Sequence, residues 1–330
     1  MSGTVSLCRY SAVTEREVEW LWFPYIPCGK LTVLQGDPGE GKSTFIINVT
    51  ALLTRGEPMP DGYRSRGPYR VVYQCAEDDI ADTIKPRLIA AGADCDRVSF
   101  IQEDDGAITV DDDRIEAAIR SEGAKMLVLD PFQAFLPQDA DMQNAQKMRA
   151  ILRKLSMIAA KTKCAVVLIG HMNKSVGGKN LYRGLGSIDI AAIARSVLMV
   201  ERDQDEPHIR YVIPIKSSLA PEGPAVAFSL DAHYGFSWLE PREDYSIQES
   251  ELCTSKCKRT ELMLQRLLCD GEMESKEVFN RMEIAGVSRR TVQKAKKNLN
   301  IEAIRMNGAW YWRFPSSPET SEEEMEEDDD

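Results

Sequence analysis

The segment GDPGEGKST, at residues 36–44, places three glycines, a lysine and two hydroxyl side chains in the pattern G-x-x-x-x-G-K-[ST]. An apolar stretch that suits a β-strand precedes it at residues 31–35, and a helical pattern begins at Lys42. Glycines allow a close backbone approach, and their N–H groups form, with the positive end of the helix, a nest for phosphate groups. Such a turn can hold a nucleoside triphosphate, with Lys42 reaching its β- and γ-phosphates and Ser43 ligating Mg²⁺.

Three further polar residues follow apolar stretches: Glu77 comes after residues 70–75, Asp130 ends KMLVLD, and His171 follows CAVVLIG. Because ligands of parallel sheets bind at the carboxyl ends of the strands, we expect these residues beside the glycine-rich turn. Asp130 suits the Mg²⁺ anchor, Glu77 the polarisation of an attacking water, and His171 the sensing of the γ-phosphate. Three alternatives stay open: Asp130 as a solvated loop acid, Glu77 as a helix cap, and His171 as a structural hydrogen bonder.

The strand before the turn and the helix after it favour a phosphate site over a chance glycine-rich turn. We therefore predict ATP and Mg²⁺ as the ligands, with the metal held by Ser43 and Asp130. The residues predicted to bind the nucleotide are Gly36, Asp37, Pro38, Gly39, Glu40, Gly41, Lys42, Ser43 and Thr44.

Apolar strands that alternate with helices must position these groups. Continuous apolar runs predict strands buried on both faces, and the run at residues 142–161 has helical periodicity. The fold class is therefore α/β, with a mainly parallel sheet covered on both faces. Strands are expected at residues 31–35, 70–75, 98–102, 125–130, 164–170, 196–201, 209–216 and 224–229. Helices are expected from 42 to 53, after 79, and at 114–121 and 142–161; in the segment after 79, Pro86 must kink the helix or start a second turn.

A polar, glycine-rich loop follows His171 at residues 172–187 and carries Lys174, Lys179 and Arg183. A basic loop beside the γ-phosphate could grip single-stranded nucleic acid and move with hydrolysis. A plain solvated surface loop is the alternative.

The net charge of −11 hides an uneven distribution. Residues 316–330 carry nine acidic and no basic side chains, whereas residues 256–314 carry 13 Lys or Arg against 7 Asp or Glu. No apolar run is long enough for a bilayer, so no membrane partner is predicted. The eight cysteines show neither zinc-ligand spacing nor a disulfide framework, which favours a reducing cytoplasm.

The basic region reads as three helices, at residues 259–269, 275–285 and 289–299, followed by a strand pair. This order is typical of a winged helix-turn-helix, with Ser288 capping the recognition helix. The alternative is a winged helix used for protein docking or support. The side chains predicted to meet DNA are Arg289, Arg290, Lys294 and Lys297.

Taken together, GDPGEGKST, the strand-end Glu77, LVLDP, GHMNKS, LYRGLGS, ARSVLMVER and IKSSLAPEGPAVAF resemble the RecA-like ring ATPases. Within them, the chain is similar to the RepA-like replicative helicases, AAA family ATPases of plasmids, phages and other mobile elements. The resemblance covers about residues 18–230. It implies a hexameric ring with ATP between subunits, single-stranded DNA through the centre, Glu77 as catalytic base and His171 as γ-phosphate sensor.

The resemblance also implies two residues that act on a neighbouring subunit's site. Arg195 is the best match for an arginine finger, and Lys216 falls where related motors place a trans-acting lysine. Ser218 stands where many of those motors have an arginine.

Five segments result: a lead-in (1–30), a RecA-like ATPase domain (31–240), a linker (241–258), a winged-helix-like domain (259–315) and a disordered acidic tail (316–330). Aromatic residues in the lead-in, such as Trp22 and Tyr25, could stack on a base, pack between subunits or cover the first strand. Three functions fit: a helicase motor on single-stranded DNA, an ATP-dependent assembly on DNA, or a site-selecting regulator.

Overall fold

The structure of the chain is a computed structural model. It describes residues 7–104, 106–137, 145–171, 188–203, 206–231, 233–240, 256–269, 271–285, 287–306 and 308–315. Lys174, Lys179, Arg183 and the tail at 316–330 lie outside these ranges, as does most of the expected linker. The chain divides into two compact units, Met1–Tyr245 and Ser246–Asp330.

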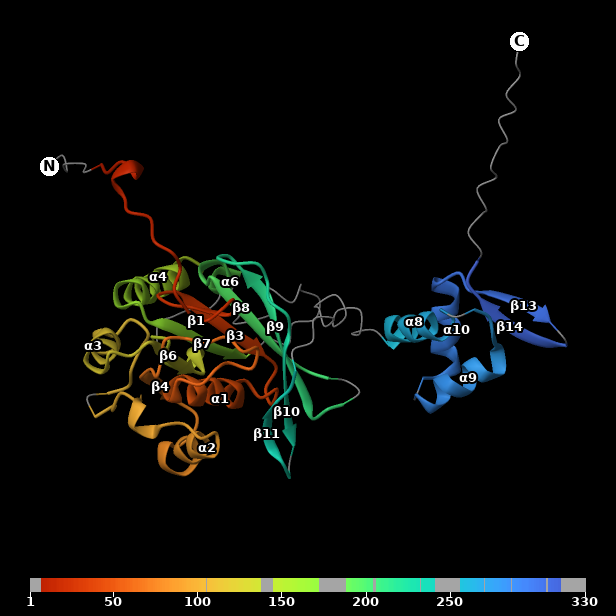
Figure 1. The fold of residues 1–330 in the computed structure, drawn as a ribbon, viewed down its shortest axis with the longest axis horizontal. Coiled ribbons are helices and arrows are strands. Elements are labelled where there is room, and N and C mark those ends of the chain that lie inside the picture. Colours follow the sequence, from red (N-terminus) through yellow and green to blue (C-terminus); the bar gives the residue numbers. More distant parts are fainter. Residues whose placement is uncertain are drawn as a thin grey trace, which may run out of the picture. The chain divides into compact units, whose positions relative to one another are not determined.

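A nine-stranded sheet forms the centre of the first unit, in the order β11-β10-β9-β8-β3-β7-β6-β4-β5 among the described residues. Strands β3 to β8 pair in parallel, and β9 to β11 continue the sheet with antiparallel pairing (Figure 1). The mainly parallel α/β sheet expected from the sequence is confirmed. The strands are β3 (Leu31–Gly36), β4 (Val71–Cys75), β5 (Val98–Ser99), β6 (Met126–Asp130), β7 (Ala165–His171), β8 (Ser196–Arg202), β9 (Ile209–Ser217), β10 (Val226–Asp231) and β11 (Gly235–Trp238).

Helices cover both faces of this sheet (Figure 1). Alternate residues of β6 illustrate the two-sided burial, because Val128 packs in one apolar cluster and Leu127 in the other. The first cluster includes α1 (Lys42–Arg55) and α2 (Lys85–Ala90), and the second includes α3 (Asp113–Glu122), α4 (Ala145–Thr162) and α6 (Ile188–Ile193).

Pro86 starts a second helical turn, one of the two outcomes expected there, because it lies in the first turn of α2 after a π-helical turn at Ile80–Ile84. Strand β5 is shorter than the stretch expected at residues 98–102. Short 3₁₀ turns lie at Tyr10–Ala12, Cys95–Arg97 and Phe132–Phe135.

The lead-in contributes a small antiparallel pair, β1 (Trp20–Trp22) and β2 (Ile26–Pro27). Trp22 and Tyr25 are 0% and 1% exposed. The centroid of the Trp22 ring lies 6.1 Å from that of the Phe45 ring on α1, and the centroids of the Phe45 and Trp238 rings lie 5.7 Å apart. These aromatic side chains therefore belong to the core that holds α1 against the sheet.

The described residues of the second unit form three helices, α8 (Lys256–Leu267), α9 (Ser275–Ile284) and α10 (Arg289–Asn298). Its antiparallel sheet has the order β12-β14-β13, built from Met273–Glu274, Ala309–Arg313 and Glu302–Met306. A separate apolar core joins these elements, with Val278, Val292 and Trp312 among its buried residues. Within the described parts of both units, no helix is both long enough and apolar enough to cross a bilayer.

The buried aromatic contact of α1 predicts a large stability effect. Phe45 is 1% exposed, so Phe45→Ala should lower the free energy of unfolding by about 3–5 kcal/mol through the cavity it leaves. Phe100 is 44% exposed, so Phe100→Ala should cost less than about 1 kcal/mol. Urea denaturation of both variants measures the difference, and equal losses would contradict this packing.

Candidate functional site

The glycine-rich turn joins the end of β3 directly to the start of α1. Gly41 has φ +91°, and a Cβ there would lie 2.6 Å from Leu230 Cδ1. A Cβ at Gly36 would lie 2.5 Å from the carbonyl oxygen of Val200. Both positions therefore favour glycine: the Val200 backbone leaves no room for a Cβ at Gly36, and Gly41 has a left-handed φ that other residues rarely adopt.

Lys42 lies at the mouth of this turn and is 4% exposed. Its Nζ donates to the carbonyl oxygens of Gly36, at 2.8 Å, and Asp37, at 2.9 Å. Burial lowers the pKa of Lys42, while nearby carboxylates, that of Asp130 first, oppose the shift. The ammonium group is thus held across the loop by backbone carbonyls.

Asp130 ends β6 with only 6% exposure. Tyr73 of β4 donates its hydroxyl to Asp130 Oδ2 at 2.7 Å, and Ser43 also makes a hydrogen bond to the carboxylate. Burial raises the pKa of Asp130, and the charge of Glu77 adds to this, whereas the hydrogen bonds from Tyr73 and Ser43 oppose it. Ser43 and Asp130, predicted to share the metal, therefore do meet.

This pair fits a Mg²⁺ ion that is held jointly with a nucleotide. A carboxylate and a hydroxyl are oxygen ligands of the kind that Mg²⁺ prefers, and Mg²⁺ usually takes its remaining ligands from phosphates and water. Within the described residues, no group of three His, Cys, Asp or Glu side chains could hold a metal ion by itself. The donor set suits a metal that arrives with phosphate oxygens.

Glu77 follows β4 and is exposed at the same edge of the sheet. Its charge acts on both Lys42 and Asp130. The cap of the following helical turn is Asp79, whose carboxylate accepts from the backbone N–H groups of Ala81 and Asp82. Asp79, and not Glu77, therefore caps this helical turn.

His171 ends β7 and pairs with Gly36 in the parallel register. Its backbone therefore lies beside the first residue of the glycine-rich turn; its side chain lies outside the described residues. The turn and the backbones of Glu77, Asp130 and His171 thus all lie at the carboxyl edge.

Arg195 and Lys216 lie at the opposite edge of the sheet. Arg195 precedes β8, where its backbone N–H donates to Leu31 at the start of β3. Lys216 Nζ donates to the carbonyl oxygens of Ala192, at 3.1 Å, and Ala194, at 2.8 Å. Burial, followed by the charge of Arg195, lowers the pKa of Lys216. The fold therefore does not bring these two residues to the glycine-rich turn of their own chain.

Two residues at the turn were not predicted from the sequence. Arg202 of β8 donates through Nη2 to the carbonyl oxygen of Gly39 at 3.1 Å, and Arg210 of β9 lies beside it in the antiparallel register. Both face Glu40. The sequence marks Arg210 only as a charged residue in a mostly apolar stretch, and its contact with Glu40 depends on the strand register.

The predicted DNA-contacting side chains are exposed on α10: Arg289, Arg290, Lys294 and Lys297. The opposite face of α10 buries Val292 and Ala295. Ser288 caps the helix by accepting from the N–H of Thr291 at 3.4 Å.

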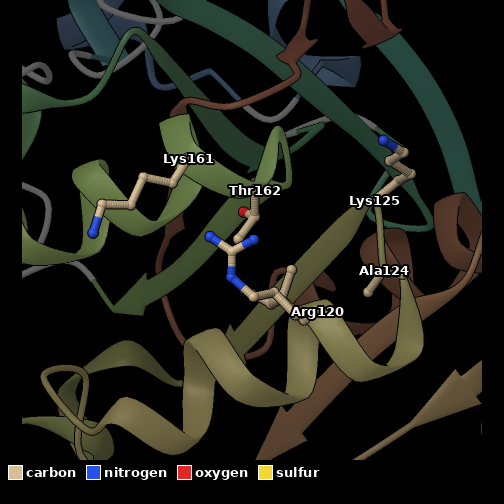
Figure 2. Close-up of a pocket in the computed structure, with 7 residues that line it drawn as sticks. Arg120, Ala124, Lys125, Lys161 and Thr162 are labelled. Carbon is tan, nitrogen blue, oxygen red and sulfur yellow. The ribbon is translucent and has the colours of Figure 1, made fainter.

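A cavity of about 260 Å³ lies at the amino edge of the sheet, away from the turn. Arg120, Lys125 and Lys161 are among its lining residues. Figure 2 shows Lys125 and Lys161 extending in different directions while Arg120 reaches toward Thr162. The cationic groups do not converge on one point, so this cavity does not form an anion site.

The raised pKa of Asp130 predicts a pH dependence of stability. The folded chain holds the Asp130 proton more tightly than the unfolded chain, so the stability that this proton provides is lost as pH rises above the ordinary carboxyl pKa of about 3.9. Asp130→Asn stays neutral, so its stability relative to wild type should rise from pH 4 to pH 8 in urea denaturation without nucleotide.

Asp112→Asn is the matched control with the opposite sign. The Arg114 side chain lowers the pKa of Asp112, so wild type should lose stability relative to this variant as pH falls. A stability difference for Asp130→Asn that is constant over the pH range would contradict the burial of its charge.

Comparison with known proteins places this chain in a family. The model of the AAA domain matches residues 4–177 of the 330. No curated protein matches the chain. Many solved structures have a similar fold. One of them is an ATPase domain with 14% sequence identity and a TM-score of 0.49. The match covers 64% of this chain and 84% of the chain of that ATPase domain. With more than half of its length matched, the chain belongs to the AAA domain family and is a P-loop ATPase.

Proposed function

We propose that this ATPase is a RepA-like helicase, a hexameric ring that hydrolyses ATP while translocating on single-stranded DNA. One observation carries the proposal: the groups for phosphate and metal lie at the carboxyl edge, whereas Arg195 and Lys216 lie at the amino edge of the same sheet. A residue at the amino edge can reach a nucleotide only in a neighbouring copy. The arrangement therefore suits sites completed between subunits.

Binding would begin with the glycine-rich turn. Its backbone N–H groups and the N-terminus of α1 attract phosphate, and Lys42 would exchange its bonds to the Gly36 and Asp37 carbonyls for the β- and γ-phosphates. Ser43 and Asp130 would hold Mg²⁺, which when bound neutralises phosphate charge. Tyr73 fixes the orientation of the Asp130 carboxylate through its hydrogen bond.

Hydrolysis would use the exposed carboxylate of Glu77. Its place after β4, beside Asp130, suits a base that orients water for attack on the γ-phosphate. His171, whose backbone adjoins Gly36, would sense the γ-phosphate. The following loop, with Lys174, Lys179 and Arg183, would grip the DNA strand.

The C-terminal unit supports DNA binding as well. The order of α8, β12, α9, α10 and the β13–β14 pair agrees with a winged helix-turn-helix. Arg289, Arg290, Lys294 and Lys297 lie on the exposed face of α10, where they would contact a DNA backbone.

A second candidate is a site-selecting regulatory ATPase without processive unwinding. The separate apolar core of the C-terminal unit favours it, since a basic module with its own core could select duplex sites. Duplex binding by the full chain that depends on sequence and is lost in Lys294→Ala, without ATP-driven strand separation, would support this candidate over the motor.

Glu77→Gln should separate binding from hydrolysis. The amide cannot accept a proton, so ATP turnover should fall by roughly 10²- to 10⁴-fold while ATP affinity stays near wild type. Phosphate release and nucleotide titration measure the two quantities. Lys42→Ala is the contrasting variant and should lose binding itself; normal turnover by Glu77→Gln would remove Glu77 from the chemistry.

Unwinding of a forked duplex by mixtures of wild-type and Arg195→Ala chains tests the ring motor. Each variant subunit would disable its neighbour's site, so unwinding should fall more steeply than the wild-type fraction and should vanish with a non-hydrolysable ATP analogue. Arg120→Ala mixtures should keep full activity. A fall proportional to the wild-type fraction would argue against a finger, and no unwinding by wild type would argue against the motor.

A further inference from the structure

The phosphate-binding turn carries a carboxylate at the last position before Gly41. Glu40 is 17% exposed in its side chain, and its Oε2 atom is buried without a hydrogen-bond partner. Burial lowers the pKa of Lys42, and the Glu40 charge is among those that oppose this shift, so the two groups interact. A negative charge this close to the anchor lysine should repel a triphosphate.

Two arginines on neighbouring strands face Glu40. Arg202 ends β8 and Arg210 lies near the start of β9, and the two are paired across the antiparallel ladder. Arg202 Nε lies 3.5 Å from Glu40 Oε1, and Arg210 Nε lies 3.9 Å from Glu40 Oε2. One carboxylate therefore lies between two guanidinium groups.

Arg210 is the more informative of the two because it is buried. Its side chain is 7% exposed, against 42% for Arg202. Burial and the charge of Arg202 lower the pKa of Arg210, and Glu40 opposes this. Arg210 also donates to the carbonyl oxygens of Ile209, at 3.1 Å, and of Pro207, but its Nε has no hydrogen-bond partner. A buried cation beside a second cation is costly unless a nearby anion compensates it.

We propose that Arg210 is a positioning residue for nucleotide binding, which holds the Glu40 carboxylate on the β8–β9 side of the turn and cancels its charge there. The inference rests on the proposed nucleotide site. Arriving phosphates would repel Glu40 toward Arg210, and the 3.9 Å between Nε and Oε2 leaves room for a charge-assisted hydrogen bond to form. Arg210 acts through Glu40 and does not contact the nucleotide.

Arg210→Met tests this, because it keeps most of the side-chain volume and removes the charge. The dissociation constants for ADP and ATP should rise by about tenfold or more, which corresponds to about 1.4 kcal/mol. Glu40→Gln together with Arg210→Met should restore affinity to within about threefold of wild type, because no carboxylate then remains at position 40 to repel the phosphates. The loss of nucleotide affinity in Arg210→Met should become smaller as the salt concentration rises, since salt screens the repulsion between Glu40 and the phosphates.

Nucleotide titration of the full chain, with thermal melting as a check on folding, gives these values. Arg120→Met is the matched control, because Arg120 is ion-paired with Glu116 on α3 and should leave affinity unchanged. Should Arg210→Met fail to fold, Arg210→Lys and Arg210→Gln make the same comparison, with affinity kept only in the charged variant.

Wild-type affinity in a folded Arg210→Met chain would overturn the inference. Equally weak nucleotide binding by Arg210→Met and by the double variant would also overturn it, since Arg210 would then only support the fold. Failure of wild type to bind nucleotide, or full binding by Lys42→Ala, would instead overturn the nucleotide site itself.

Discussion

Burial of the parallel strands on both faces is the constraint on which the rest of the first unit depends. Strands β3, β6 and β7 present alternate side chains to two apolar clusters, so charged groups have no place along them. Polar residues are therefore confined to the strand ends. Parallel pairing then brings the ends of the strands to one edge, where Lys42, Glu77 and Asp130 interact.

The charges at this edge are balanced at a cost in stability. Burial works against the charged forms of both Lys42 and Asp130, and the hydrogen bonds that Lys42 donates to carbonyl oxygens and that Asp130 makes with Tyr73 and Ser43 compensate only in part. A phosphate group beside Lys42 and a divalent cation beside Asp130 would favour both charged forms. Ionisable groups whose pKa values are shifted by burial are expected in sites that bind a ligand. Strand β9 reaches both edges, with Arg210 near one end and Lys216 near the other.

The sequence predicted much of this fold for a physical reason. Continuous apolar runs and a glycine-rich turn are local signals, so the strand ends at Asp130 and Glu77 could be placed on one edge from spacing alone. Tyr73, Arg202 and Arg210 could not, because their contacts depend on strand order and register, which bring β4 beside β6 and β9 beside β8. The sequence left the role of Trp22 open among three alternatives, because its packing on Phe45 depends on how the chain before β3 folds back over α1.

Equilibrium titration of the wild-type chain with a fluorescent ATP analogue, with and without Mg²⁺, tests the central claim most directly. If the carboxyl edge is a nucleotide site, binding should saturate at one nucleotide per chain, be displaced by ATP, and weaken when Mg²⁺ is removed. Binding that does not saturate, or that ATP does not displace, would contradict the account.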